Sequence, residues 1–89
     1  LLENAEERYR NKDYKNALIY YEQLLDDENS NNSRILLKIA NCYSFLNNYE
    51  QAMIFYDRAI NSDPMNYHAY NNVGGIFFGA LDGKWQYRA

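Results

Sequence analysis

The chain has 89 residues, 47% of them hydrophobic, and a net charge of −3. This length allows one small domain, and the acidic balance argues against a nucleic-acid-binding protein, which would present a basic face. The single cysteine, Cys42, excludes an intrachain disulfide framework and fits a reducing compartment. No basic leader or cleavage signal follows Leu1, and no apolar run is long enough to cross a bilayer. We therefore expect a protein of the cytoplasm, or of the nucleus, without a membrane segment.

The hydrophobic pattern predicts helices from end to end. In chain order these cover about residues 1–10, 14–27, 33–46, 49–62 and 67–81. Asp13, Asn48 and Asn66 are the expected N-caps, Ser33 is expected to open the third helix, and Pro64 follows the end of the fourth. Residues 84–89 follow no clear pattern. This interpretation leaves no place for a β-sheet.

Apolar and small residues recur at steps of three and four along these segments. In the third segment they are Leu36, Ile39, Ala40, Tyr43 and Leu46. Ala40 and Ala52 are expected on facing helices, where small side chains allow the two axes to approach closely. Tyr43, Tyr49 and Tyr56 are expected to fill the space between the layers.

Two stretches of the sequence repeat one another. Asp13-Tyr14-Lys15-Asn16-Ala17 recurs as Asn48-Tyr49-Glu50-Gln51-Ala52, an offset of 35 residues. A second echo, from Leu36, Ile39, Ala40 and Tyr43 to Tyr70, Val73, Gly74 and Phe77, has an offset of 34 residues. A period of this length predicts stacked helical hairpins.

With these residues in place, the chain resembles the tetratricopeptide repeat family. The second unit carries the whole family pattern, in Leu36, Ile39, Ala40, Tyr43, Ala52, Tyr56, Ala59 and Pro64. The resemblance implies an all-α fold, a right-handed α-solenoid of two full repeats plus a partial third. The repeats cover about residues 1–32, 33–66 and 67–89, in one domain that is expected to be a piece of a longer array.

The resemblance also implies that the first helix of each hairpin lines a concave groove that holds a partner peptide. The implied peptide-binding residues are Glu6, Arg34, Leu37, Lys38, Asn41, His68, Asn71 and Asn72. Spacing agrees independently, because Arg34, Lys38 and Asn41 share one stripe of their helix. Asn41 and Asn72 would hydrogen-bond peptide amides, and Arg34 and Lys38 would pair with a carboxylate.

No motif indicates catalysis, a metal or a cofactor. The segment Gly79 to Lys84 lacks the spacing of a phosphate loop, and the segment from Asp27 has Lys38 where a calcium loop needs a glutamate. His68 is the only histidine, and Cys42 is expected to be buried packing. We therefore expect a non-catalytic scaffold with a protein or peptide partner.

Self-association is the alternative function. The expected fifth helix carries Val73, Ile76, Phe77 and Phe78, and no recognisable helix follows to cover them. A solenoid needs a polar outer face at its ends, so stacking with a second chain through this C-terminal helix would make a homo-oligomer.

Overall fold

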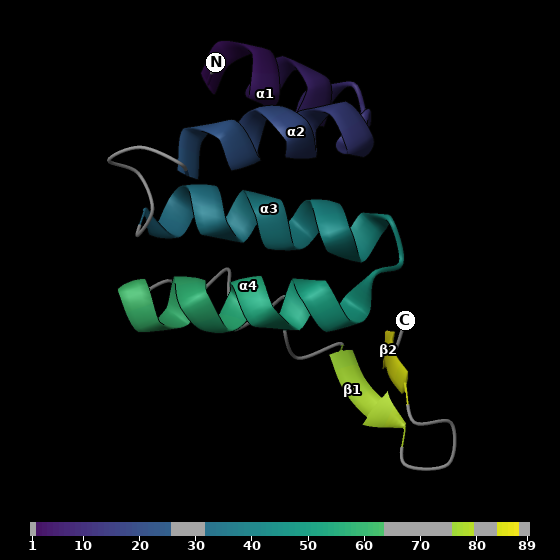
Figure 1. Cartoon of the computed structure of the whole chain (residues 1–89). Helices are drawn as coiled ribbons and strands as arrows, with labels where there is room; N and C mark the ends of the chain where they lie inside the picture. The colour runs from purple at the N-terminus through teal and green to yellow at the C-terminus, as the bar shows by residue number, and fades with distance from the viewer. Residues whose placement is uncertain (1, 26–31, 64–75, 80–83, 88–89) are drawn as a thin grey trace.

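The computed structural model describes residues 2–25, 32–63, 76–79 and 84–87. Four helices are present in these ranges: α1 (Leu2–Arg10), α2 (Tyr14–Leu25), α3 (Ser33–Phe45) and α4 (Tyr49–Ser62). Each helix packs against the next one along the chain, so the four form a layered stack (Figure 1). The stack of two helical hairpins confirms the predicted repeat architecture over residues 2–63.

The two hairpin turns have the same hydrogen bonds at the same offset. After α1, the Asp13 amide donates to the Arg8 carbonyl at 2.9 Å and the Lys12 amide donates to the Tyr9 carbonyl at 3.0 Å. After α3, Asn48 and Asn47 repeat these bonds to Tyr43 and Ser44 at 2.8 and 3.0 Å. This is the Schellman helix ending, in which one residue takes the left-handed conformation. That residue is Lys12 (φ 63°) in the first hairpin and Asn47 (φ 65°) in the second.

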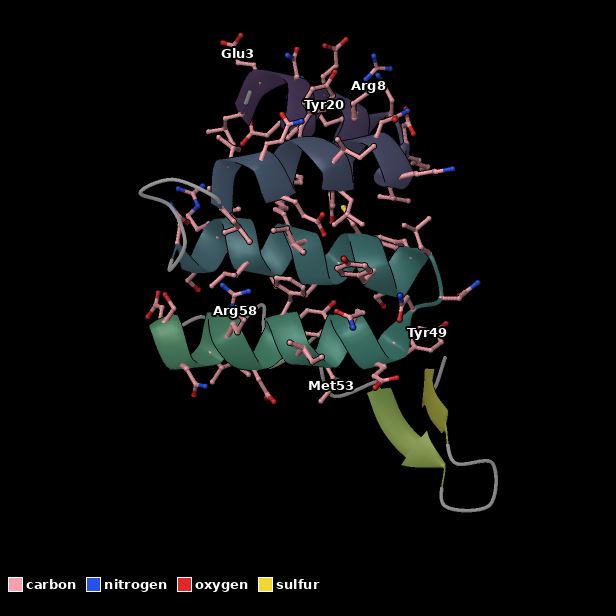
Figure 2. The ribbon with its side chains drawn as sticks, in the orientation of Figure 1. Glu3, Arg8, Tyr20, Tyr49, Met53 and Arg58 are labelled. Carbon is pink, nitrogen blue, oxygen red and sulfur yellow. The ribbon has the colours of Figure 1, made fainter. Side chains whose placement is uncertain are left out.

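The starts of α2 and α4 have the predicted capping residues, and α3 is capped by Asn32, which was not predicted. The Asp13 and Asn48 side chains accept from the amides three residues ahead, at 3.5 and 3.4 Å, which confirms both caps. Tyr49 follows as the first residue of α4, beside the α3–α4 turn (Figure 2). Ser33 opens α3 as predicted, but the capping side chain is that of Asn32, which accepts from the Arg34 and Ile35 amides at 3.0 and 3.2 Å. The Ser33 hydroxyl instead donates to the Ala59 carbonyl at 3.1 Å and joins the start of α3 to α4.

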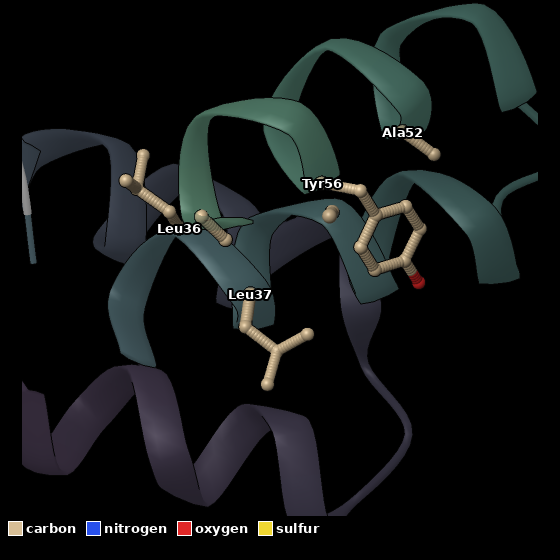
Figure 3. Close-up of a cluster of buried hydrophobic side chains, with 6 residues drawn as sticks. Leu36, Leu37, Ala52 and Tyr56 are labelled. Carbon is tan, nitrogen blue, oxygen red and sulfur yellow. The ribbon is translucent and has the colours of Figure 1, made fainter. Parts of the chain in front are cut away.

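Two buried clusters hold the stack together. The first joins α3 to α4 and includes Leu36, Ala40, Ala52 and Tyr56, each no more than 2% exposed (Figure 3). Ala40 and Ala52 have no exposed surface, so the prediction that small residues lie at this contact is confirmed.

The second cluster joins the two hairpins through Ala5, Ala17, Tyr21, Ile35, Ile39 and Cys42. Tyr43 extends it, because its hydroxyl donates to a Glu22 carboxylate oxygen at 2.7 Å across the α2–α3 contact. The Cys42 side chain is fully buried, as predicted, and burial raises the pKa of its thiol to about 12. The thiol therefore stays protonated at neutral pH and serves as packing.

The C-terminal part differs from the prediction. Strands β1 (Ile76–Gly79) and β2 (Lys84–Tyr87) form an antiparallel two-stranded sheet in which Ile76 lies opposite Tyr87. The predicted fifth helix, 67–81, is therefore wrong over residues 76–79, and the all-α class holds for the helical stack but not for this hairpin. Residues 67–75 lie outside the described residues.

The strand residues explain the difference. Ile76, Phe77 and Phe78 are β-branched and aromatic, and such residues favour strands. Asp-Gly at 82–83 is a hairpin-turn sequence, and the segment after it alternates polar and aromatic residues with the strand period of two. The strand β2 contacts α4, so the hairpin adjoins the last helix of the stack (Figure 1).

Candidate functional site

The α3 helix places its polar stripe beside α1, and two hollows open along this contact. The first, which we call the Arg34 hollow, has a volume of about 360 Å³. It is lined by side chains of α1, α2 and α3 together with the cap of α3: Leu2, Glu6, Tyr21, Leu24, Asn32, Arg34, Ile35 and Lys38. Three of the predicted site residues, Glu6, Arg34 and Lys38, therefore come together from two different repeats.

Three charged side chains border the Arg34 hollow. Arg34 is exposed and Lys38 half-buried, and within the described ranges no carboxylate oxygen lies within 4.0 Å of either cation. Glu6 is exposed on the α1 side. Two cations and one carboxylate give the described part of the lining a net positive charge, although the chain as a whole is acidic.

Tyr21 adds an unused hydrogen-bonding group. Its side chain is 1% exposed, and its buried hydroxyl has no hydrogen-bond partner in the described structure. Burial first, and the nearby Glu6 carboxylate second, raise the pKa of Tyr21, so the hydroxyl stays protonated. A buried polar group without a partner costs stability, and a ligand that reached it would remove that cost.

The second hollow lies further along α3, and we call it the Tyr9 pocket. It has a volume of about 440 Å³ and an uncharged lining: Tyr9, Asn41, Ser44, Phe45, Asn47, Tyr49 and Tyr56. The two hollows adjoin, because the Lys38 ammonium, which borders the first, lies 4.2 Å from the centre of the Tyr9 ring, which borders the second.

Asn41, a predicted peptide-binding residue, takes part in a hydrogen-bond network inside the protein. Its amide nitrogen donates to the Tyr9 hydroxyl at 3.2 Å, and its carbonyl oxygen accepts from the Tyr56 hydroxyl at 2.6 Å. These bonds join α1, α3 and α4 and fix the orientation of the amide. Asn41 therefore shapes the wall of the Tyr9 pocket, a role that its spacing in the sequence does not reveal.

Leu37, another predicted site residue, is not among the described residues that line the two hollows. Leu37 is 8% exposed and belongs to the α3–α4 cluster with Leu36, so the structure places it in the core and not on the open face (Figure 3). The family resemblance implied a groove residue at this position, but Leu37 packs in the buried cluster that joins α3 to α4. His68, Asn71 and Asn72 lie outside the described residues.

Some lining residues were missed by the sequence interpretation. Phe45 is the next position of the stripe that contains Arg34, Lys38 and Asn41, so its spacing could have identified it. Tyr9 stands one turn beyond Glu6 and could have been found in the same way. Tyr49 and Leu24 come from second helices of hairpins, and only the packing of one helix on another brings them to this surface.

Neither metal ligands nor a membrane span stands out in the described structure. Within the described ranges, His, Cys, Asp and Glu side chains form no group of three or more that could hold a metal ion. No helix among the described residues is long and apolar enough to cross a membrane.

Comparison with known proteins identifies the class of protein that this stack represents. The tetratricopeptide repeat family model matches residues 8–73, more than half of the chain, and the protein belongs to this family. A comparison with curated proteins finds no match. Repeats of this family generally mediate protein–protein interaction and generally act as non-catalytic scaffolds.

Proposed function

We propose that this protein is a non-catalytic interaction scaffold that binds an extended peptide, or an extended segment of a partner protein, along α1 and α3. The observation that carries the proposal is the Arg34 hollow, in which charged residues of two repeats line one space over the apolar side chains of Leu24 and Ile35. Partly apolar hollows with a few convergent polar groups are the usual form of a binding site.

The charges of the hollow indicate which peptides bind. Arg34 and Lys38 attract a carboxylate, and the guanidinium can hold it through two hydrogen bonds. Glu6 repels the same group from the α1 side. An acidic side chain of the peptide is therefore expected to lie against α3 and away from Glu6.

Selection of random twelve-residue peptides against residues 1–89, followed by fluorescence-polarisation titration of the selected peptides, tests this function. Arg34→Ala is expected to weaken binding by about two- to ten-fold, since a partly exposed charge pair contributes a modest free energy. Glu6→Gln is expected to strengthen it, because it removes the repulsion. Lys15→Ala, at an exposed position of α2 outside the hollow, is the matched control and should change nothing.

Two results would contradict the proposal. One is that no selected peptide binds in solution. The other is that Arg34→Ala and Lys15→Ala bind the selected peptides alike. Sedimentation of the same sample over a range of concentrations separates peptide binding from self-association. The self-association alternative relied on a C-terminal helix, but the backbone at 76–79 is a strand.

A further inference from the structure

The Tyr9 pocket has a chemistry that differs from that of the Arg34 hollow. None of the seven described residues that line it carries a charge, and four of them, Tyr9, Phe45, Tyr49 and Tyr56, are aromatic. It lies on the same face of α3 as the Arg34 hollow, and the contact between Lys38 and Tyr9 joins the two. A peptide that follows α3 would meet both.

Three hydrogen bonds join polar side chains that line the pocket. Tyr56 and Tyr49 donate to the carbonyl oxygens of Asn41 and Asn47 at 2.6 and 2.8 Å, and Asn41 donates to Tyr9 at 3.2 Å. These bonds use the hydroxyl protons of two tyrosines within the protein. The pocket therefore presents mainly the edges and faces of aromatic rings.

Phe45 provides apolar surface at this site. Its side chain is 56% exposed, although it stacks on Tyr14 with ring centres 4.3 Å apart and meets the Tyr9 ring edge-on at 6.4 Å. A further aromatic ring would extend this cluster with the edge-to-face geometry that such rings prefer. It would also remove the exposed part of Phe45 from water.

The separation of the two sites sets the spacing in the ligand. The distance along α3 from the turn with Arg34 and Lys38 to the turn with Asn41 and Phe45 is about 10 to 16 Å, at about 1.5 Å per helical residue. An extended peptide covers this distance in about three to five residues. The positive lining of the first site and the uncharged aromatic lining of the second require different side chains at the two ends of this span.

We propose that one extended peptide occupies both sites, with a single acidic side chain in the Arg34 hollow and an aromatic side chain in the Tyr9 pocket, about three to five residues apart. The inference rests on the proposed function and specifies its ligand. One acidic residue fits better than a run of them, because Glu6 leaves the described lining of the hollow with one net positive charge.

Synthetic peptides of defined sequence test the inference. In an Ala/Ser host, one glutamate and one phenylalanine are placed at separations from one to eight residues, and binding to residues 1–89 is measured by fluorescence polarisation. Peptides with the proposed separation are expected to bind about ten-fold more tightly than peptides that carry only one of the two residues. Phe45→Ala should reduce this advantage several-fold, and Ile54→Ala, which removes an exposed apolar side chain of α4 outside both hollows, should not.

A double-mutant cycle between Phe45→Ala in the protein and Phe→Ala in the peptide gives the decisive coupling. Circular dichroism of each variant verifies that the helices are intact. If separation has no effect, or if peptides with glutamate alone bind as well, the two-site inference is wrong while peptide binding stands. If none of these peptides binds but selected peptides do so through Arg34, the inference fails and the proposed function survives. If neither set binds, both are overturned.

Discussion

The ammonium of Lys38 lies 4.2 Å from the centre of the Tyr9 ring. Tyr9 lies in the last turn of the first helix of one repeat and Lys38 lies in the first helix of the next, so the contact joins the two repeats on the side that carries both hollows. An ammonium over the face of an aromatic ring is attracted by the ring quadrupole. The pair fixes the position of a charge that the proposed peptide would meet.

The Lys38–Tyr9 contact should contribute measurably to the free energy of unfolding. A double-mutant cycle with Lys38→Met and Tyr9→Leu is expected to give a coupling of about 0.5–1 kcal/mol, the range for exposed cation–π pairs. Urea unfolding monitored by circular dichroism measures it. A coupling near zero would mean that the ammonium is solvated and free of the ring.

Asn41 should be more important for stability than a solvated groove residue. Asn41→Ala removes the oxygen that accepts from the Tyr56 hydroxyl, while the hydroxyl stays inside the protein. The free energy of unfolding should therefore fall by about 1–3 kcal/mol. Tyr56→Phe removes the hydroxyl itself and should cost less, about 0.5–1.5 kcal/mol. Gln23→Ala, at an exposed position of α2, is the control and should stay within about 0.5 kcal/mol of the wild type. Equal effects of Asn41→Ala and Gln23→Ala in thermal melts would contradict the network.

The left-handed residue of the first turn should be open to improvement. Lys12 has φ 63°, a conformation that costs energy for a residue with a Cβ and little for glycine. Lys12→Gly is therefore expected to stabilise the protein by about 0.5–1 kcal/mol. The equivalent change Asn47→Gly should gain less, because asparagine tolerates this conformation. A lower melting temperature for Lys12→Gly would show that the lysine side chain contributes more than its backbone strain costs.

The close contact of α3 with α4 should not accept a large side chain. Ala52 is fully buried against Ala40, so Ala52→Trp must separate the helices, at a cost of about 1–3 kcal/mol from overpacking. The exposed neighbour Glu50→Trp is the control. A melting temperature of Ala52→Trp equal to that of the control would mean that the interface is loosely packed.

The protein should lose stability at alkaline pH. Burial, together with the hydrogen bond to Glu22, raises the pKa of Tyr43 from 10.0 to about 12, and burial raises the pKa of Cys42 from 9.0 to about 12. Because these pKa values are higher in the folded state, the stabilisation is complete below the unfolded values and is lost as pH rises towards the folded ones. The free energy of unfolding should therefore fall between about pH 9 and 12.

Urea titrations at several pH values measure this fall. Tyr43→Phe removes one of the groups with a raised pKa, so the stability of this variant should decline less steeply above pH 10.0, even though it starts lower without the Glu22 hydrogen bond. Parallel curves for the variant and the wild type would exclude Tyr43 as a cause.

The sequence by itself determined the local structure of the helical hairpins. The steps of three and four, the caps at Asp13 and Asn48 and the offset of 35 residues place four helices and their turns correctly, because helix periodicity and capping are local properties. Small residues at Ala40 and Ala52 also predict the close helix contact. The same local patterns gave a wrong prediction at Ile76 to Phe78, because these residues fit a helical stripe and a strand equally well. Only the pairing of this segment with the one after Asp82-Gly83 distinguishes a strand from a helix here.

Only the tertiary structure decided which polar residues line the proposed site. Glu6, Arg34 and Lys38 meet because side chains of α1 and α3 border the same hollow, whereas Leu37, which lies next to Lys38 in the sequence, belongs to the buried α3–α4 cluster. Asn41 is committed to Tyr9 and Tyr56, which are 32 and 15 residues away in the sequence. Spacing along one helix identifies a face, but the partners of that face come from other helices, and only their packing sets burial, hydrogen bonding and charge.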